Sequence, residues 1–166
     1  AIVEKASYSR IDGIVAVGDR PAVLGALAAQ ALGVRFHPTE AARLATNKLG
    51  TRSRFRDAGV PVPWFKSAPF DIDNRDLRDA PFPCVVKPLA LSASRGVIRA
   101  NNPSELEAAI DRLGKLLRCT SVLSRREKAS DRFLLEEYIP GREVAIEGVV
   151  TNGRFRVFTI FDKPDP

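Results

Sequence analysis

FLLEEYIPGRE, from Phe133 to Glu143, is the stretch of this sequence that decides the fold. Its apolar start predicts a buried strand, and Pro140–Gly141 predicts a turn directly after it. Extended backbone leaving a strand can offer N–H and C=O groups to a purine edge, and Glu143, beyond the turn, could accept hydrogen bonds from two ribose hydroxyls. The same residues also fit a strand followed by a solvated acidic turn, so this stretch alone leaves both interpretations open.

A second informative stretch is PCVVKP (83–88), which predicts a strand bounded by prolines. It carries Lys87 among apolar residues, and because burying an unpaired ammonium is costly, this lysine needs an anion or an open cleft. The small-residue loop LSASRG (91–96) follows, before GVIRA (96–100) as the returning strand. Its hydroxyls, its backbone N–H groups and Arg95 suit a phosphate. A solvent-facing lysine before an ordinary hairpin fits equally well.

The N-terminal part shows the pattern of a parallel α/β unit. GIVAV (13–17) and VRFH (34–37) are predicted strands on either side of an alanine-rich helix that Pro21 opens and Gly33 ends. Asp19 and Arg20 follow the first of these strands and face either the substrate side of a cleft or a structural turn. Thr39 is the predicted cap of a further helix, and TRSRFRDAG (51–59) is a second one.

Farther along, the patterns alternate between polar segments and regular elements. They predict, in chain order, a loop-like stretch over 66–81 with a short helix near 74–78, an amphipathic helix capped by Ser104, a mobile basic segment over 118–132, and a hairpin of EVAIEGVV (143–150) and RFRVFTIF (154–161) around Asn152–Gly153.

Composition limits the class of protein. The 166 residues are 45% hydrophobic and 28% charged, which is ordinary globular composition, and the net charge of +6 suits an anionic ligand such as a nucleotide or a nucleic acid. No apolar run approaches a membrane span, no signal peptide opens the chain, and Cys84 and Cys119 form no disulfide or metal pattern, so a cytoplasmic location is predicted. His37 is the single histidine, which excludes a His-rich metal site. The absence of methionine suggests a piece of a longer protein.

Five stretches, taken in order, resemble a known family. The Asn47–Lys48 helix, RDAGVPVPWF (56–65), PCVVKP (83–88), the Ser/Gly loop and LLEEYIPGREVAIEG (134–148) look like the ATP-grasp superfamily, in the carboxylate–amine ligase branch with biotin carboxylase-like and D-alanine ligase-like members. The resemblance implies an α/β and α+β fold present as a fragment. Its expected parts are the tail of an N-terminal parallel α/β domain (1–40), connecting helices and linker (41–81), the lid subdomain (82–139) and the start of the larger subdomain (140–166).

The resemblance also implies a nucleotide site. Lys48 and Lys87 would contact phosphate, Glu136 would lie near the adenine amino group, and Glu143 would hold the ribose. The full set of implied ATP-binding residues is Lys48, Lys87, Ser92, Ser94, Arg95, Gly96, Glu136, Glu137, Ile139 and Glu143. This loop departs from the family pattern, which is richer in glycine, because Ala93 restricts the backbone there.

The implied reaction is an ATP-dependent ligation. A carboxylate attacks the γ-phosphate of Mg-ATP, and an amine or another nucleophile then displaces phosphate from the acyl-phosphate. The resemblance assigns no catalytic or metal-binding residue to this chain, since it places the Mg²⁺ ligands beyond Pro166, so the chain alone is expected to bind nucleotide weakly or not at all and not to turn it over. The expected partners are ATP, a small carboxylate and an amine, and the oligomeric state, a homo-oligomer included, stays open.

Two other functions fit parts of the sequence. One is a nucleotide-binding module without ligase activity. The other is a basic nucleic-acid-binding domain, which is disfavoured because the basic stretch from Arg118 to Arg132 lacks interleaved aromatic residues that could stack on bases.

Overall fold

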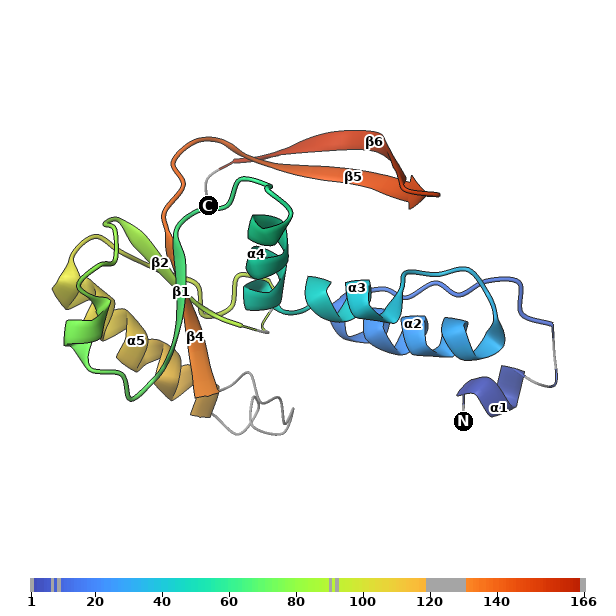
Figure 1. Cartoon of the computed structure of the whole chain (residues 1–166), viewed down its shortest axis with the longest axis horizontal. Coiled ribbons are helices and arrows are strands. Elements are labelled where there is room, and N and C mark those ends of the chain that lie inside the picture. Colours follow the sequence, from blue (N-terminus) through green and yellow to red (C-terminus); the bar gives the residue numbers. More distant parts are fainter. Residues whose placement is uncertain are drawn as a thin grey trace.

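The computed structural model describes residues 2–6, 8, 10–89, 91, 93–118 and 131–164 as a mixed α/β structure (Figure 1). The predicted mobile segment falls mainly on 119–130, which lies outside the described residues. Among the described helices, none is long and apolar enough to cross a membrane. The elements are α1 (Ile2–Ala6), α2 (Asp19–Leu32), α3 (Thr39–Ala45), α4 (Lys48–Asp57), β1 (Phe65–Pro69), the 3-10 helix η1 (Asn74–Leu77), β2 (Cys84–Pro88), β3 (Ile98–Ala100), α5 (Pro103–Arg118), β4 (Arg132–Glu137), β5 (Glu143–Thr151) and β6 (Arg154–Lys163).

The central unit is a four-stranded antiparallel sheet in the order β1-β4-β2-β3, with α5 packed on one face. Strand residues alternate between faces, so every second side chain of β2 and β4 turns toward α5. Cys84, Val86, Phe133 and Leu135 are fully buried there. The apolar stripe of α5 that meets them consists of Leu106, Ala109, Ile110, Leu113 and Leu117.

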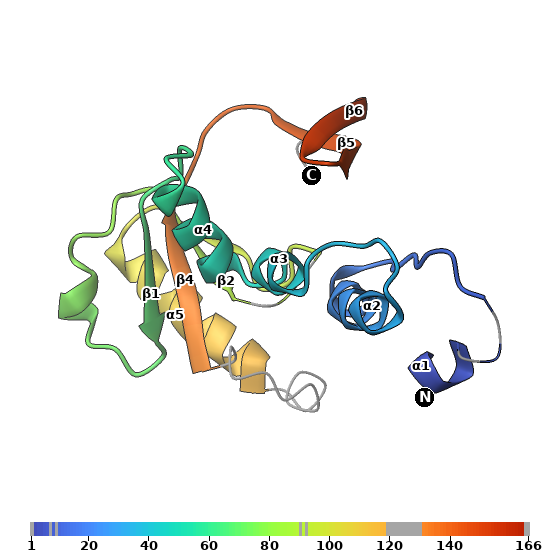
Figure 2. The same ribbon diagram turned by 45° about the vertical axis from the view of Figure 1, so that its right-hand side comes forward.

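The opposite face of this sheet is partly polar. The ladder pairs Lys87 with Leu134 and Val85 with Glu136, and these four side chains share the face turned away from α5. Helix α4 lies on this side, in front of the strands in Figure 2, while α5 lies behind them. No residue of α4 is buried, so this helix makes no apolar core with the sheet.

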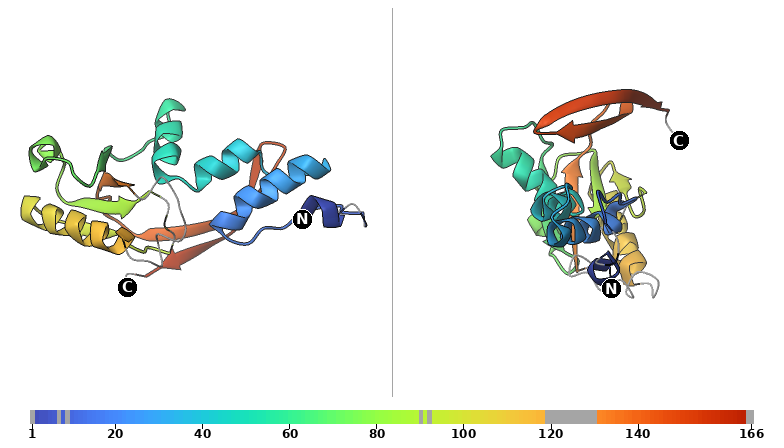
Figure 3. Two further views of the ribbon diagram at one scale, coloured as in Figure 1. Left: turned by 90° about the horizontal axis from the view of Figure 1, so that it is seen from below. Right: turned by 90° about the vertical axis from the view of Figure 1, so that its right-hand side faces the viewer.

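The predicted hairpin is confirmed. β5 and β6 pair antiparallel around Asn152 and Gly153, whose φ angles of 51° and 75° match a type I′ turn. The hairpin continues from β4 through residues 138–142 and extends beside the rest of the chain (Figure 3). Large apolar side chains on both of its faces are exposed, among them Phe158 at 68% and Ile160 at 59%.

The helix of the N-terminal unit is confirmed, but its two predicted strands are wrong. α2 ends where Gly33 takes a φ of 68°, as predicted. Residues 13–17 and 34–37 are described, and neither stretch forms a strand. Both still lie against α2, since a Cβ added to Gly25 would come within 3.1 Å of Ala16 and of Phe36. A strand requires a hydrogen-bonded neighbour, and the two stretches do not pair.

Both predicted helix caps are displaced. Thr39 begins α3, but its hydroxyl donates to Gln30 Oε1 at 2.9 Å instead of capping the helix. Ser104 lies inside α5, and the capping oxygen is Asn102 Oδ1, which accepts from the Glu105 N–H at 3.0 Å. The N-cap is the residue directly before the helix, and a short polar side chain there accepts from an N–H group in the first turn. Here that residue is Asn102, while Ser104 already lies within the helix.

The loop-like interpretation of 66–81 is wrong at its start, where β1 forms, and right in its short helix, η1. β1 exists because it pairs with β4, in the register Phe65 to Glu136 and Pro69 to Arg132. The sheet therefore takes an edge strand from inside 41–81. The four proposed part boundaries stay a prediction.

Candidate nucleotide-binding site

Three charged side chains meet on the polar face of the sheet. Arg52, from α4, donates to both carboxylate oxygens of Glu136 on β4, with Nε–Oε1 at 2.7 Å and Nη2–Oε2 at 3.3 Å. Lys87, from β2, forms an ion pair with Glu136 Oε2. The Glu136 side chain is 4% exposed, and the Arg52 and Lys87 side chains are 28% and 17% exposed. Two cations thus share one buried carboxylate, which leaves the cluster positive.

The buried carboxylate explains why these cations are present. Removing a partner from a buried ion pair costs about 3–5 kcal/mol, because the remaining charge stays in a poorly solvated place. The sequence-based interpretation that Lys87 needs an anion is therefore correct in kind, and the anion in this structure is Glu136.

Lys48 adds a third cation at the N-terminal end of α4. Asn47 caps this helix by accepting from the Gly50 N–H, so Lys48 is held in the first turn. Its backbone N–H donates to Leu89 O at 3.1 Å, and its Nζ donates to Leu91 O at 2.5 Å, which ties it to the loop after β2. Burial lowers the pKa of Lys48 below its usual 10.5, and the neighbouring Lys87 charge lowers it further.

Opposing charges act on Lys48 as well. Asp19 and Glu136 both work to raise its pKa, although less than burial and Lys87 lower it. Asp19 is therefore one of the charges that act on Lys48, and its predicted place facing either a cleft or a structural turn stays a prediction. The side chain of Arg20 lies outside the described part of the chain.

The loop after β2 is tightly wound. Ala93, Ser94 and Gly96 all have left-handed φ angles, of 56°, 55° and 74°, and Val97 N donates to Ser94 O at 3.1 Å. Ala93 was expected to restrict this backbone, yet it takes a conformation that favours glycine. Ser94 and Arg95 are exposed at the loop surface, and Ser92 lies outside the described residues.

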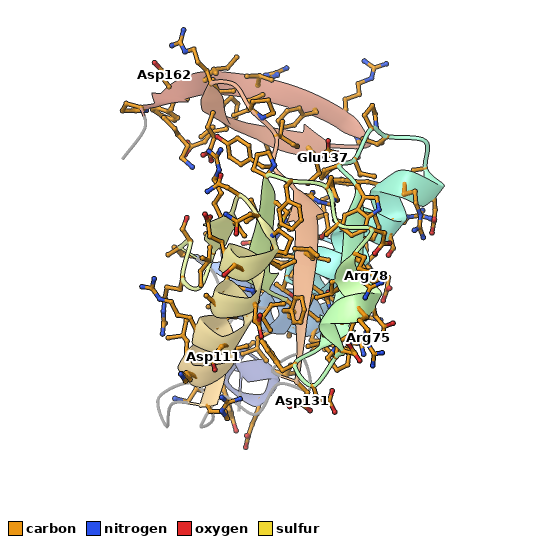
Figure 4. All side chains as sticks on the ribbon, turned by 90° about the vertical axis from the view of Figure 1, so that its left-hand side faces the viewer. Arg75, Arg78, Asp111, Asp131, Glu137 and Asp162 are labelled. Carbon is orange, nitrogen blue, oxygen red and sulfur yellow. The ribbon has the colours of Figure 1, made fainter. Side chains whose placement is uncertain are left out.

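The exit of β4 forms the other end of the site. Glu137 N donates to Trp64 O at 2.9 Å, Trp64 N donates to Glu137 Oε2 at 3.4 Å, and Tyr138 N donates to Pro83 O at 3.0 Å. Figure 4 shows Glu137 between the sheet and the hairpin. Ile139 follows in the link to β5 and is 66% exposed. The strand exit is therefore anchored through Trp64 and Pro83 and open at Ile139.

Glu143 stands apart from the cation cluster, at the start of β5. It forms an exposed ion pair with Lys163 across the hairpin, next to the Arg142–Asp162 pair at 2.6 Å. Exposed pairs of this kind contribute little to stability, so they leave these side chains available for other contacts.

The structure brings Lys48, Lys87 and Glu136 together, and no described contact joins Glu143 to them. Arg52 is the residue that the sequence interpretation missed. Its one signal was spacing, since Arg52 follows Lys48 by four residues on a helix and therefore shares its face. A guanidinium on that face also needs a carboxylate, and Glu136 lies 84 residues away in sequence.

The part of the chain that carries most of this site matches a known protein family. The family model for the ATP-grasp domain matches residues 80–166, which contain β2, the loop after it, β4 and the hairpin. The chain belongs to the ATP-grasp family. This match confirms the resemblance and the fold class predicted from the sequence. No curated protein matches the sequence.

Solved structures of two ligases and a synthetase resemble the chain. L-amino acid ligase from Bacillus licheniformis is 24% identical with a TM-score of 0.73, covering 99% of this chain and 36% of its own. D-alanine–D-alanine ligase from Helicobacter pylori is 22% identical with a TM-score of 0.58, covering 81% and 39%. The ADP complex of PurK, an N5-carboxyaminoimidazole ribonucleotide synthetase, is 13% identical with a TM-score of 0.69, covering 99% and 40%. The chain thus spans well under half the length of each of these three proteins, and the likeness shows a shared fold.

Proposed function

We propose that this chain supplies the adenine, ribose and part of the phosphate contacts of an ATP-grasp ligase. The observation that carries the proposal is the cluster of Lys48, Lys87 and Arg52 around one buried carboxylate, of which Lys87 and Glu136 lie within the part of the chain that matches the ATP-grasp domain. A cluster with more positive than negative charge, partly shielded from water, favours a polyanionic ligand.

In this proposal the triphosphate lies at the cation end of the polar face. Lys48 and Lys87 neutralise phosphate charge, and Ser94, Arg95 and the backbone of the wound loop close over the outer phosphates. The adenine edge lies at the strand exit, against Glu136, the backbone of Glu137 and Ile139. Glu143 would accept from the ribose hydroxyls.

The proposed reaction is the activation of a carboxylate. A carboxylate oxygen attacks the γ-phosphorus of ATP, the bond to the β-phosphate oxygen breaks, and ADP leaves. An amine then attacks the acyl carbon, and phosphate leaves with the bonding electrons while the amine loses a proton. The residues named above position and neutralise the triphosphate, which is the main protein contribution to phosphoryl transfer.

Magnesium would neutralise charge between the phosphates in such a reaction. In the described part of the chain, no group of three or more His, Cys, Asp or Glu side chains could hold a metal ion. We assign no residue of the described part of the chain to magnesium, and no step to that ion.

The experiment uses the single tryptophan as a reporter. Trp64 shares two hydrogen bonds with Glu137 at the proposed adenine end, so bound ATP should change its fluorescence. We expect a weak but saturable change with ATP, a loss of that change in Lys87→Gln, and no effect of Arg54→Gln, an exposed arginine on α4. No saturable change in the wild type, or equal binding by Lys87→Gln, contradicts the proposal. ATP hydrolysis by the purified chain would contradict the expectation that this chain alone does not turn ATP over.

A further inference from the structure

Arg52 has no role in the nucleotide contacts proposed above, yet it makes the best-formed ion pair of the cluster. Its guanidinium contacts both oxygens of Glu136 side-on, at 2.7 and 3.3 Å. A planar, bidentate contact of this kind fixes the plane of a carboxylate, which a lysine cannot do. Arg52 therefore has the geometry to hold Glu136 still.

Lys87 contacts Glu136 at one point, whereas Arg52 contacts it at two. Lys87 contacts a single oxygen, Oε2, which also accepts from Arg52. Its ammonium can rotate and exchange partners, whereas the guanidinium is bound at two points. An incoming phosphate would compete with Glu136 for Lys87 before it competed for Arg52.

The transfer of Lys87 to a phosphate has a consequence for Glu136. This side chain is 4% exposed, and a buried carboxylate without a cation is strongly unfavourable. Lys48, the other cation that acts on Glu136, already donates to Leu91 O. Of the three cations Lys48, Arg52 and Lys87, Arg52 is therefore the one that still contacts Glu136 once Lys87 has moved away.

We propose that Arg52 is a positioning residue that frees Lys87 for the triphosphate. It keeps the Glu136 carboxylate neutralised and oriented while the Lys87 ammonium moves from Glu136 to a phosphate oxygen. This inference rests on the proposed function. It deepens that function by naming the group that permits Lys87 to serve the ligand instead of the protein.

The test is a double-mutant cycle between Arg52→Gln and Glu136→Gln, with inorganic tripolyphosphate as the probe. This probe has the phosphates of ATP but no base, so it avoids the proposed adenine contact of Glu136. Binding is measured by phosphorus NMR titration of the 166-residue chain, and circular dichroism confirms that each variant is folded. Arg54→Gln, which removes an equal charge two residues away on the exposed side of α4, is the matched control.

We expect Arg52→Gln to weaken tripolyphosphate binding roughly tenfold in the wild-type background, within the range of coupling between contacting residues. In the Glu136→Gln background no buried carboxylate retains Lys87, so Arg52→Gln should cost no more than the Arg54→Gln control. If Arg52 acted only through its distant charge, the loss would be the same in both backgrounds, and that result overturns the inference. If Arg52→Gln does not fold, Arg52→Lys takes its place in the same cycle, with a smaller but still background-dependent loss expected.

Failure of the inference and failure of the proposed function give different results. A wild-type chain that binds neither ATP nor tripolyphosphate overturns both. A wild-type chain that binds both ligands and loses them in Lys87→Gln, but shows no coupling between Arg52 and Glu136, overturns the role of Arg52 and leaves the nucleotide site in place.

Discussion

Replacing Gly96 with alanine tests how the backbone of the loop after β2 is fixed to α5. Gly96 has a φ of 74°, and an added Cβ would lie 2.7 Å from Leu113 Cδ1 and 3.0 Å from Leu116 Cδ2. Leu113 is fully buried in the core of α5, so its methyl group has little room to move aside. The substitution therefore meets both an unfavourable backbone conformation and a filled space.

The two costs can be estimated separately. A left-handed conformation costs an alanine about 1–2 kcal/mol, and overpacking a core costs about 1–3 kcal/mol. Gly96→Ala should thus lower the free energy of unfolding by about 2–5 kcal/mol. Gly59 offers a matched control, because its φ is 73° and a Cβ added there meets nothing within 4 Å. Gly59→Ala should cost only the backbone part, about 1–2 kcal/mol.

Urea denaturation, followed by circular dichroism and by Trp64 fluorescence, measures both free energies. The contact with Leu113 is then tested directly by repeating Gly96→Ala in a Leu113→Ala background, where the cost should fall toward that of Gly59→Ala while Leu116 Cδ2, at 3.0 Å, stays in place. Equal costs for the two glycine variants in the wild-type background would refute the steric part of the reasoning. An unchanged cost of Gly96→Ala in the Leu113→Ala background would show that Leu113 is not the obstacle.

Three further predictions concern charge, a helix cap and a thiol. Because burial and Lys87 lower the pKa of Lys48 from 10.5, its ammonium loses its proton at a lower pH than an exposed lysine does. Tripolyphosphate affinity, measured by NMR, should therefore fall as the pH rises through that lowered pKa, and Lys48→Arg should remove this dependence. Asn102→Ala should lower the free energy of unfolding by about 1 kcal/mol while Ser104→Ala changes it by less than about 0.5 kcal/mol, since Asn102 holds the cap; equal urea midpoints would argue against this cap. Burial raises the pKa of the Cys84 thiol from 9.0 to about 11. In a Cys119→Ser background, Cys84 should therefore react with a disulfide reagent roughly a hundredfold more slowly than a free thiol at the same pH, and rapid labelling of the folded chain would contradict this expected rate.

The elements with local signals were predictable from the sequence. β2 and β4 are apolar runs bounded by turn residues, and the hairpin has Asn152–Gly153 between two alternating strands. β1 was missed because KSAP carries no strong strand signal, and it becomes a strand only through its ladder with β4. The predicted strands 13–17 and 34–37 fail for the converse reason, because an apolar run alone does not provide a pairing neighbour.

The site was predictable where a residue conflicted with its local environment. Lys87 in an apolar strand pointed to an anionic partner or an open cleft, and in the structure it pairs with Glu136. Arg52 lies in TRSRFRDAG, where every charge fits a solvated helix, so no local conflict marked it. Its partner becomes visible only when α4 packs on the polar face. The glycine-like turn at Ala93 was hidden in the same way, since tertiary structure imposes that conformation on an alanine.

The two faces of the sheet are held by different forces, and this difference matters for the proposed site. On one face, α5 buries an apolar stripe that no small ligand can replace. On the other, α4 has no buried residue and contacts its surroundings through a stripe of cations spaced by four, with Lys48 on Leu91 O, Arg52 on Glu136 and Arg56 over the Phe65 ring. A phosphate can compete for ammonium and guanidinium groups, so contacts of this second kind are exchangeable in a way that the α5 core is not. The polar contacts of α4 thus give Glu136 a second cation, which a helix packed by leucines alone would not supply, since Glu136 and Lys87 would then have only each other.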